Sequence, residues 1–147
     1  MLIPVPAITL AQEANFHKVP SFVFISAAAG APMLPKRYIT TKRDAESTIA
    51  SSLPKLRSIF IRPGFLYDSS RMFTLPIAFA GSAGNMANSL LGGRLSWIAG
   101  AAVEKPLKPD LVAEAVVEAI EDNNTKGVIA TSEIEALATK AWRRGML

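Results

Sequence analysis

The sequence contains no cysteine and only one histidine, His17, among its 147 residues. The lack of cysteine excludes disulfide bonds, thiolate catalysis and cysteine metal sites. A single histidine cannot form a histidine-based metal cluster, so we predict no metal site. His17 follows a helix-like stretch, and we interpret it as a surface residue at a helix end.

A glycine-rich nucleotide loop is also missing from the sequence. In a Rossmann fold, three closely spaced glycines after the first strand let the backbone approach a dinucleotide pyrophosphate at a helix N-terminus. Gly81-Ser82-Ala83-Gly84 is followed by no third glycine in register and lies late in the chain. We therefore expect this chain alone to bind a dinucleotide weakly or not at all.

The charge is mildly basic, with a formal net charge of +4. The basic residues are spread along the chain, the densest cluster being Lys140, Arg143 and Arg144, and aromatic residues do not alternate with them. This distribution argues against nucleic-acid binding. It is compatible with peripheral association with an anionic membrane surface.

The composition predicts one globular domain, because 50% of the residues are hydrophobic and 19% are charged. The apolar N-terminus, Met1–Leu10, is broken by Pro4 and Pro6, is too short to span a bilayer and has no basic leader. We therefore predict no targeting segment within this chain.

The order of apolar runs and breakers predicts an α/β fold with a parallel sheet. Strands are expected at 21–26, 57–61 and 127–130. Helices are expected at 7–17, 36–52, 110–122 with Asp110 as its cap, and from 131 or 132 to 142. In the helix 36–52, Tyr38, Lys42 and Ala45 are predicted to share one face, with Arg43 and Glu46 pointing outward.

Tyr38 and Lys42 are the candidate catalytic pair of the sequence. Residues four apart on a helix project from one face, so the Lys42 ammonium can lie near the Tyr38 phenol. A nearby positive charge lowers the pKa of a tyrosine and makes its hydroxyl usable as an acid or base.

Three stretches, Phe22–Gly30, Tyr38–Glu46 and Ile59–Asp68, resemble the short-chain dehydrogenase/reductase superfamily. The resemblance is closest to atypical mitochondrial members associated with coenzyme Q biosynthesis and with respiratory complex I. It implies the C-terminal part of a Rossmann-like doubly wound parallel sheet that lacks the N-terminal nucleotide-binding half. Residues 1–147 would be one partial NAD(P)-binding domain, with distal strands and helices in about 1–70 and a substrate-side segment in about 71–147.

The resemblance also implies site residues and a cofactor, NAD(P)H, in a full-length parent protein. Tyr38, Lys42 and Ser26 would be catalytic, and Tyr38, Lys42, Pro63, Gly64 and Phe65 would contact the cofactor. The register places Ala27 where active members carry a serine, and a slip of one residue would put Ser26 there instead. Alanine cannot donate that hydrogen bond, which favours a weakly catalytic or non-catalytic protein. The alternative for Pro63-Gly64 is an ordinary turn.

Two functions follow from the resemblance. One is an auxiliary NAD(P)-binding protein in mitochondrial ubiquinone biosynthesis or respiratory-chain assembly, on the matrix side of the inner membrane. The other is an active NAD(P)H-dependent reductase of a carbonyl or quinone-like substrate. The apolar segment Met72–Leu91 could line a quinone or isoprenoid pocket, or pack beneath the sheet edge.

Overall fold

The computed structural model describes residues 5–28, 36–64, 66–67 and 106–145 as an α/β structure. Its helices are α1 (Val5–Phe16), α2 (Lys36–Ser52), α5 (Pro109–Glu121) and α6 (Thr131–Gly145). Its strands are β1 (Ser21–Ile25), β2 (Arg57–Ile61) and β3 (Gly127–Ile129). None of the helices within these ranges is long and apolar enough to cross a membrane.

The three strands form one parallel sheet in the order β1-β2-β3. Val23 lies opposite Ile59 in the first pair, and Ile59 lies opposite Gly127 in the second. Beyond the strands, the amide of Ser26 donates to the carbonyl of Ile61 and the amide of Arg62 donates to that of Ile129. The carboxyl ends of all three strands therefore meet at one edge, which is where open parallel sheets bind ligands.

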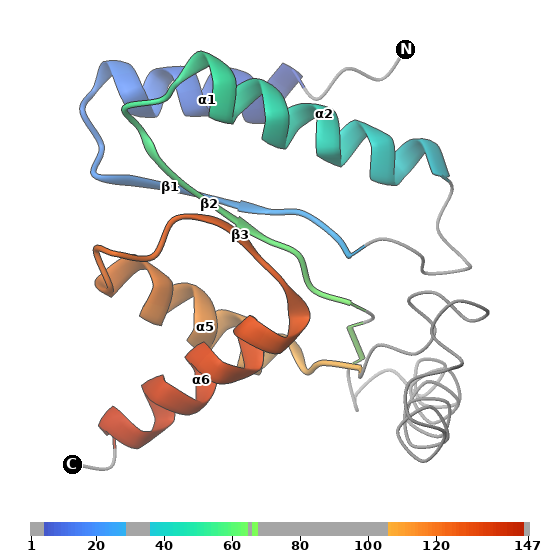
Figure 1. Ribbon diagram of the computed structural model, residues 1–147, viewed down its shortest axis with the longest axis vertical. Helices are drawn as coiled ribbons and strands as arrows, with labels where there is room; N and C mark the ends of the chain where they lie inside the picture. Colours follow the sequence, from blue (N-terminus) through green and yellow to red (C-terminus); the bar gives the residue numbers. More distant parts are fainter. Residues whose placement is uncertain (1–4, 29–35, 65, 68–105, 146–147) are drawn as a thin grey trace.

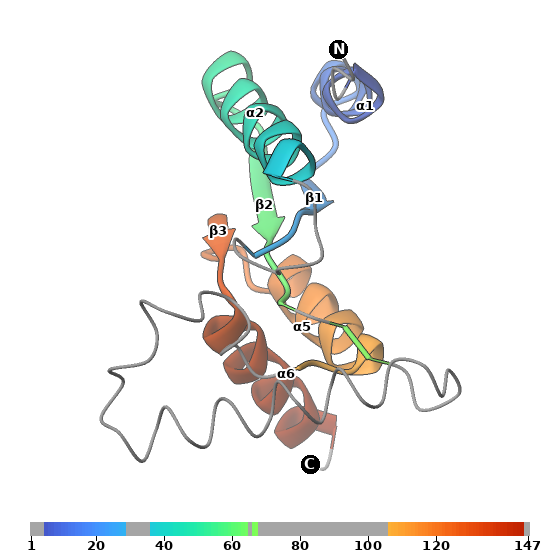
Figure 2. The ribbon, with the colours of Figure 1, turned by 90° about the vertical axis from the view of Figure 1, so that its right-hand side faces the viewer.

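Helices cover both faces of the sheet (Figure 1). α1 and α2 lie on one face and α5 and α6 on the other, and a view turned by 90° confirms the layering (Figure 2). Strand residues alternate between two hydrophobic clusters, as period-two side-chain placement requires. The cluster under α1 and α2 is built on Ala11, Ile49, Leu56 and Phe60, together with Phe22 and Phe24. The cluster above α5 and α6 contains Ile59, Ile61, Val112, Ala115, Ile129 and Ile134, among others.

Arg57, at the start of β2, fixes the C-terminal end of α5. Its guanidinium group donates hydrogen bonds to the carbonyls of Ala119, Ile120, Asp122 and Thr125 at 2.7–3.3 Å. The last carbonyls of a helix have no partner within the helix, and a cation there also complements the helix dipole. The contact therefore ties α5 to the sheet.

The α/β class and the parallel sheet are confirmed. The described part of the second half, residues 106–145, joins the same sheet through β3. Asp110 is not the cap of α5, because Lys108 occupies that position, Pro109 begins the helix, and Asp110 lies in the first turn. His17 follows α1 and is exposed, as expected. The predictions for Met72–Leu91 lie outside the described residues.

Candidate functional site

Ser26, Tyr38 and Lys42 lie at the carboxyl-end edge of the sheet. Ser26 directly follows β1, and the first turns of α2 carry Tyr38 and Lys42. The helix starts after Pro35 and returns over the sheet to Leu53-Pro54, so its N-terminal half stands above the ends of the strands (Figure 1). The fold thus brings Lys42 to the end of β1, where it binds the carbonyl of Ile25, 17 positions earlier in the sequence.

The Lys42 ammonium is held by backbone and by aromatic rings. Its Nζ donates to the carbonyl of Ile25 at 2.9 Å, lies 4.5 Å from the centre of the Phe24 ring and 5.8 Å from that of Tyr38. Partial burial lowers the pKa of Lys42 below its ordinary value, although the carboxylate of Glu46 opposes this change. The predicted closeness of Tyr38 and Lys42 on one helix face is confirmed.

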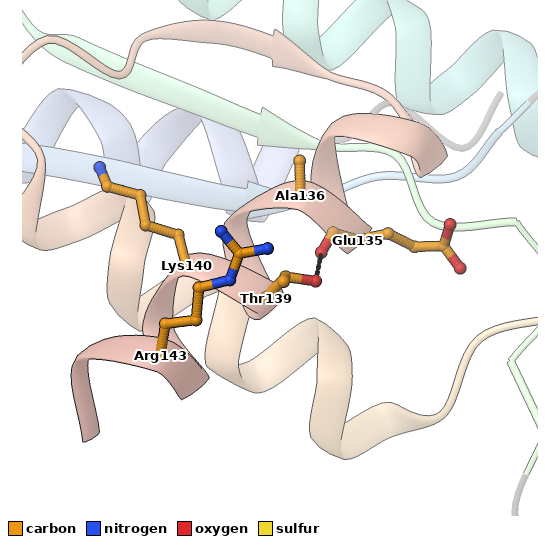
Figure 3. A pocket seen from close by; sticks show the side chains of 5 residues that line it. All are labelled: Glu135, Ala136, Thr139, Lys140 and Arg143. Carbon is orange, nitrogen blue, oxygen red and sulfur yellow. Dashed lines mark hydrogen bonds between the residues drawn. The ribbon is translucent and has the colours of Figure 1, made fainter. Parts of the chain in front are cut away.

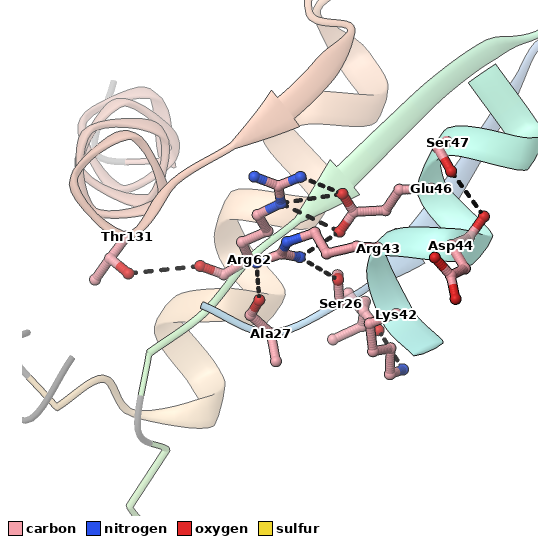
Figure 4. Close-up of polar contacts among 10 residues, drawn as sticks. Ser26, Ala27, Lys42, Arg43, Asp44, Glu46, Ser47, Arg62 and Thr131 are labelled. Carbon is pink, nitrogen blue, oxygen red and sulfur yellow. Dashed lines mark hydrogen bonds and ion pairs between the residues drawn. The ribbon is translucent and has the colours of Figure 1, made fainter. Parts of the chain in front are cut away.

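Glu46 organises a polar cluster beside this pair. The prediction that Arg43 and Glu46 point outward is wrong, because Glu46 is only 4% exposed and pairs with two arginines. Arg43 Nη1 lies 2.8 Å from one carboxylate oxygen, and Arg62 binds both oxygens through Nε and Nη2. Figure 4 shows the two guanidinium groups converging on Glu46 from α2 and from the end of β2.

Arg43 also joins the cluster to β1. It donates to Ser26 Oγ at 3.1 Å and to the carbonyl of Ala27 at 2.7 Å. Ser26, predicted as catalytic, is therefore buried in an ion-pair network. Arg62 was not predicted as a member of this cluster, because it was interpreted only as part of a turn. The available signal was an arginine directly after the end of a buried strand.

The pKa of Glu46 is held below its ordinary value. Burial alone would raise it, but hydrogen bonds from Arg62 and Ser26 and the charges of Arg43 and Arg62 outweigh that effect. The carboxylate therefore stays ionised at neutral pH and neutralises one of its two cationic partners. Arg43 and Arg62 form ion pairs with Glu46, whereas Lys42 donates its hydrogen bond to the carbonyl of Ile25.

The remaining predicted contacts are only partly described. Pro63 is buried, and its carbonyl accepts a hydrogen bond from the amide of Ala28 at 2.8 Å. This bond joins the segments that follow β1 and β2. Gly64 is half-buried beside it, whereas Phe65 lies outside the described residues.

Two of the hollows in the described part of the chain are informative. One, of about 420 Å³, is lined by a single stretch of α6 running from Glu135 to Arg143 (Figure 3). It lies on the helix and not at the carboxyl ends of the strands, and we assign it no function. The other, of about 320 Å³, borders the Glu46 cluster between α2 and β3. No group of three or more metal-binding side chains is present in the part of the chain that the structure describes.

Comparison with known proteins shows a relative that matches most of this chain. The chain is similar to MIOREX complex component 2 of Saccharomyces cerevisiae, with 31% identity over 117 residues. The match covers 78% of this chain and 42% of the relative, so the chain spans less than half of that protein's length. No protein-family model matches the chain.

These findings overturn the assignment to the short-chain dehydrogenase/reductase superfamily. The relative is named for a complex, and no dehydrogenase family model matches. An NAD(P)-binding auxiliary role in ubiquinone biosynthesis and the alternative of an active reductase both depended on that assignment, and both are corrected. Tyr-x-x-x-Lys on a helix and Pro-Gly after a strand are short features, which an α/β fold can carry without that chemistry. The quinone ligand is unsupported, and NAD(P)H and the roles of individual site residues stay untested predictions.

Proposed function

We propose that this chain is part of a mitochondrial protein that acts within a multi-protein complex for gene expression. The observation that carries the proposal is the 117-residue similarity to a protein named as a component of the MIOREX complex. Because mitochondrial gene expression takes place in the matrix, we place the protein on the matrix side of the inner membrane. Binding to partner proteins, and not turnover of a substrate, is then its main activity.

Exposed apolar side chains support a role in protein association. Leu10 and Phe16 of α1 are 62% and 76% exposed, and Trp142 of α6 is 61% exposed. Large aromatic residues contribute strongly to protein interfaces when they become buried. Figure 2 shows that α1 and α6 lie on opposite faces of the sheet. The molecule therefore has exposed apolar side chains on each side.

The finer fold assignment belongs to the same proposal. We propose that β1, β2 and β3 are part of a larger Rossmann-like sheet within a single domain. In support, β1 packs apolar residues on both faces, Phe22 and Phe24 towards one cluster and Val23 towards the other. Such a pattern is typical of strands inside a parallel sheet. The edge with Tyr38, Lys42 and Ser26 would then be its ligand-binding edge.

The proposal is tested by affinity purification of the tagged full-length protein from isolated mitochondria. We expect a reproducible set of gene-expression proteins to be recovered, and the double substitution Leu10→Ser and Phe16→Ser to reduce their recovery at equal bait abundance. Glu13→Ser, on the same helix and also exposed, serves as the matched control. Purification without such proteins, or detection of the tagged protein only in the non-mitochondrial cell fraction, would contradict the proposal.

A further inference from the structure

The outer edge of β1, on the side away from β2, is open. Within the part of the chain that the structure describes, β1 pairs with β2 alone. Both strands are short apolar runs of five residues, yet β2 is buried at four of its positions and β1 at none. Ile25, at the end of β1, is 43% exposed. An open apolar edge of this kind presents unpaired backbone groups and is a template for a further strand.

The hydrogen bonds around β1 show which of its backbone groups face outward. Successive residues of a strand direct their N–H and C=O groups to alternate sides. The amide of Ser26 donates to the carbonyl of Ile61 at the end of β2. Val23 and Ile25 lie an odd number of residues from Ser26, so their backbone groups face away from β2. Lys42 Nζ binds the outward carbonyl of Ile25, which leaves the C=O of Val23 and the N–H of Ile25 for pairing with another strand.

The position of α1 indicates the source of that strand. α2 joins β1 to β2 and packs on β2, whereas α1 precedes β1 and packs on β1 and α2. Figure 2 shows both helices on one face of the sheet, with α1 beyond β1 on the side away from β2. α1 therefore stands where a helix would lie if it connected β1 to a strand on its outer side.

The handedness of helix crossovers leads to the same place. Two parallel strands joined by one helix almost always cross over in the right-handed sense. On one face of a sheet, such crossovers all advance in the same direction, and α2 advances from β1 to β2. The connection from β2 to β3 is much longer and is not a unit of this kind. A strand that leads into α1 would therefore lie against the outer edge of β1.

We propose that a further strand of the longer protein, the one that leads into α1, pairs in parallel with the outer edge of β1; this inference rests on the larger sheet proposed above. The chain spans 42% of the relative's length, so a protein of that size has residues for such a strand. The added strand is apolar on both faces, because β1 presents Phe22 and Phe24 to one cluster and Val23 to the other. The pairing stops at Ile25, whose outward carbonyl already binds Lys42.

Amide hydrogen exchange in β1 tests the proposal. It is measured on the 147-residue chain and on the full-length protein purified from mitochondria and separated from its partners. In the chain alone, the amide of Phe24, which faces β2, should exchange at least about tenfold more slowly than the amide of Ile25. In the full-length protein, the amide of Ile25 should become as protected as that of Phe24. Equal exchange of Ile25 in the two proteins would overturn the proposal.

Two other outcomes would overturn it and identify a different arrangement. Protection of Ile25 in the chain alone that rises with protein concentration would assign the edge to a second copy. Protection of Val128, the outward residue of β3, without protection of Ile25 would extend the sheet at β3 instead. Absence of both kinds of protection would also remove the support for a larger sheet, whereas membership of a complex is judged separately by co-purification.

Substitution of Val23 provides a matched pair of variants. Val23→Pro removes the outward N–H as well as part of the side chain, whereas Val23→Ala removes side-chain atoms only. A strand tolerates proline where its N–H faces away from the sheet, but not where that N–H pairs with a neighbour. The urea midpoint of Val23→Pro should therefore lie further below that of Val23→Ala in the full-length protein than in the chain alone. An equal difference in both proteins would contradict the added strand. If Val23→Pro folds in neither protein, the exchange of Ile25 in the unaltered proteins still decides.

Discussion

At the scale of single residues, Glu46 determines how the carboxyl end of the sheet is held together. Its carboxylate is buried between Arg43 of the same helix and Arg62 at the end of β2. Through Arg43 the cluster also holds Ser26 and the carbonyl of Ala27, so one acidic side chain links three segments. Removing one partner of such a group leaves the others buried without charge compensation, which is costly.

Glu46→Gln should lower the free energy of unfolding by about 1–3 kcal/mol at pH 7. Because the pKa of Glu46 is lower in the folded state than in the unfolded state, its stabilisation is complete above the ordinary glutamate pKa. It is lost as the pH falls through the lower, folded-state pKa. Urea denaturation of both proteins at several pH values should therefore show a difference that shrinks towards acidic pH.

Asp44→Asn is the matched control for this substitution. Asp44 lies two residues earlier on α2 and is exposed, so its replacement should change the stability little at any pH. If Glu46→Gln and Asp44→Asn were equally mild at pH 7, the buried carboxylate would not stabilise the fold as described.

At the scale of the elements, two basic residues add polar contacts to the apolar packing of α5 and α6. Arg57 binds the carbonyls at the end of α5. Lys140 of α6 reaches the carboxylates of Glu118 and Asp122, at 2.9 and 3.2 Å. Hydrogen bonds to Glu118 and Asp122 raise the pKa of Lys140, so this link is present at neutral pH and is lost as the pH rises through that raised value.

Arg57→Gln should destabilise the protein by about 1–2 kcal/mol, since several helix-end carbonyls lose a charged donor. Hydrogen exchange should report the largest loss of protection in the last turn of α5. Lys55→Gln, an exposed change just before β2, should leave the protection of α5 unaltered. A uniform loss over all helices would argue against a local capping role for Arg57.

Lys140→Gln should increase amide exchange in α6 at neutral pH while leaving β2 protected, because the charged link joins α6 to α5 only. Lys126→Gln provides a control at an exposed lysine near β3. Unchanged exchange in α6 would show that apolar contacts, such as those of Ile134 and Ala138, hold the helix without the charged link.

At the scale of the whole molecule, the sequence was sufficient for the order and type of the described elements. The bounds of α2, Lys36–Ser52, could be predicted because prolines flank the helix at 35 and 54. β1 and β2 were recognisable from short apolar runs rich in phenylalanine and isoleucine. Contacts between elements were not predictable in this way: Arg62 is 16 residues from Glu46, and Arg57 reaches carbonyls 62 to 68 positions away.

The function could not be predicted from the same features. Tyr38 and Lys42 do lie near each other, but their spacing reports a helix face and not a reaction. The similarity to a complex component extends over 117 residues, far beyond the few positions that suggested a dehydrogenase. The five-residue motif from Tyr38 to Lys42 was therefore less informative about function than the similarity over 117 residues.

The central claim is most directly tested by sedimentation of the endogenous protein from a mitochondrial extract on a density gradient. We predict that it migrates well ahead of a free polypeptide, together with proteins of mitochondrial gene expression, and that it returns to light fractions when complexes are dissociated. Sedimentation only at the mass of the free protein, in an extract whose other complexes remain intact, would contradict the account.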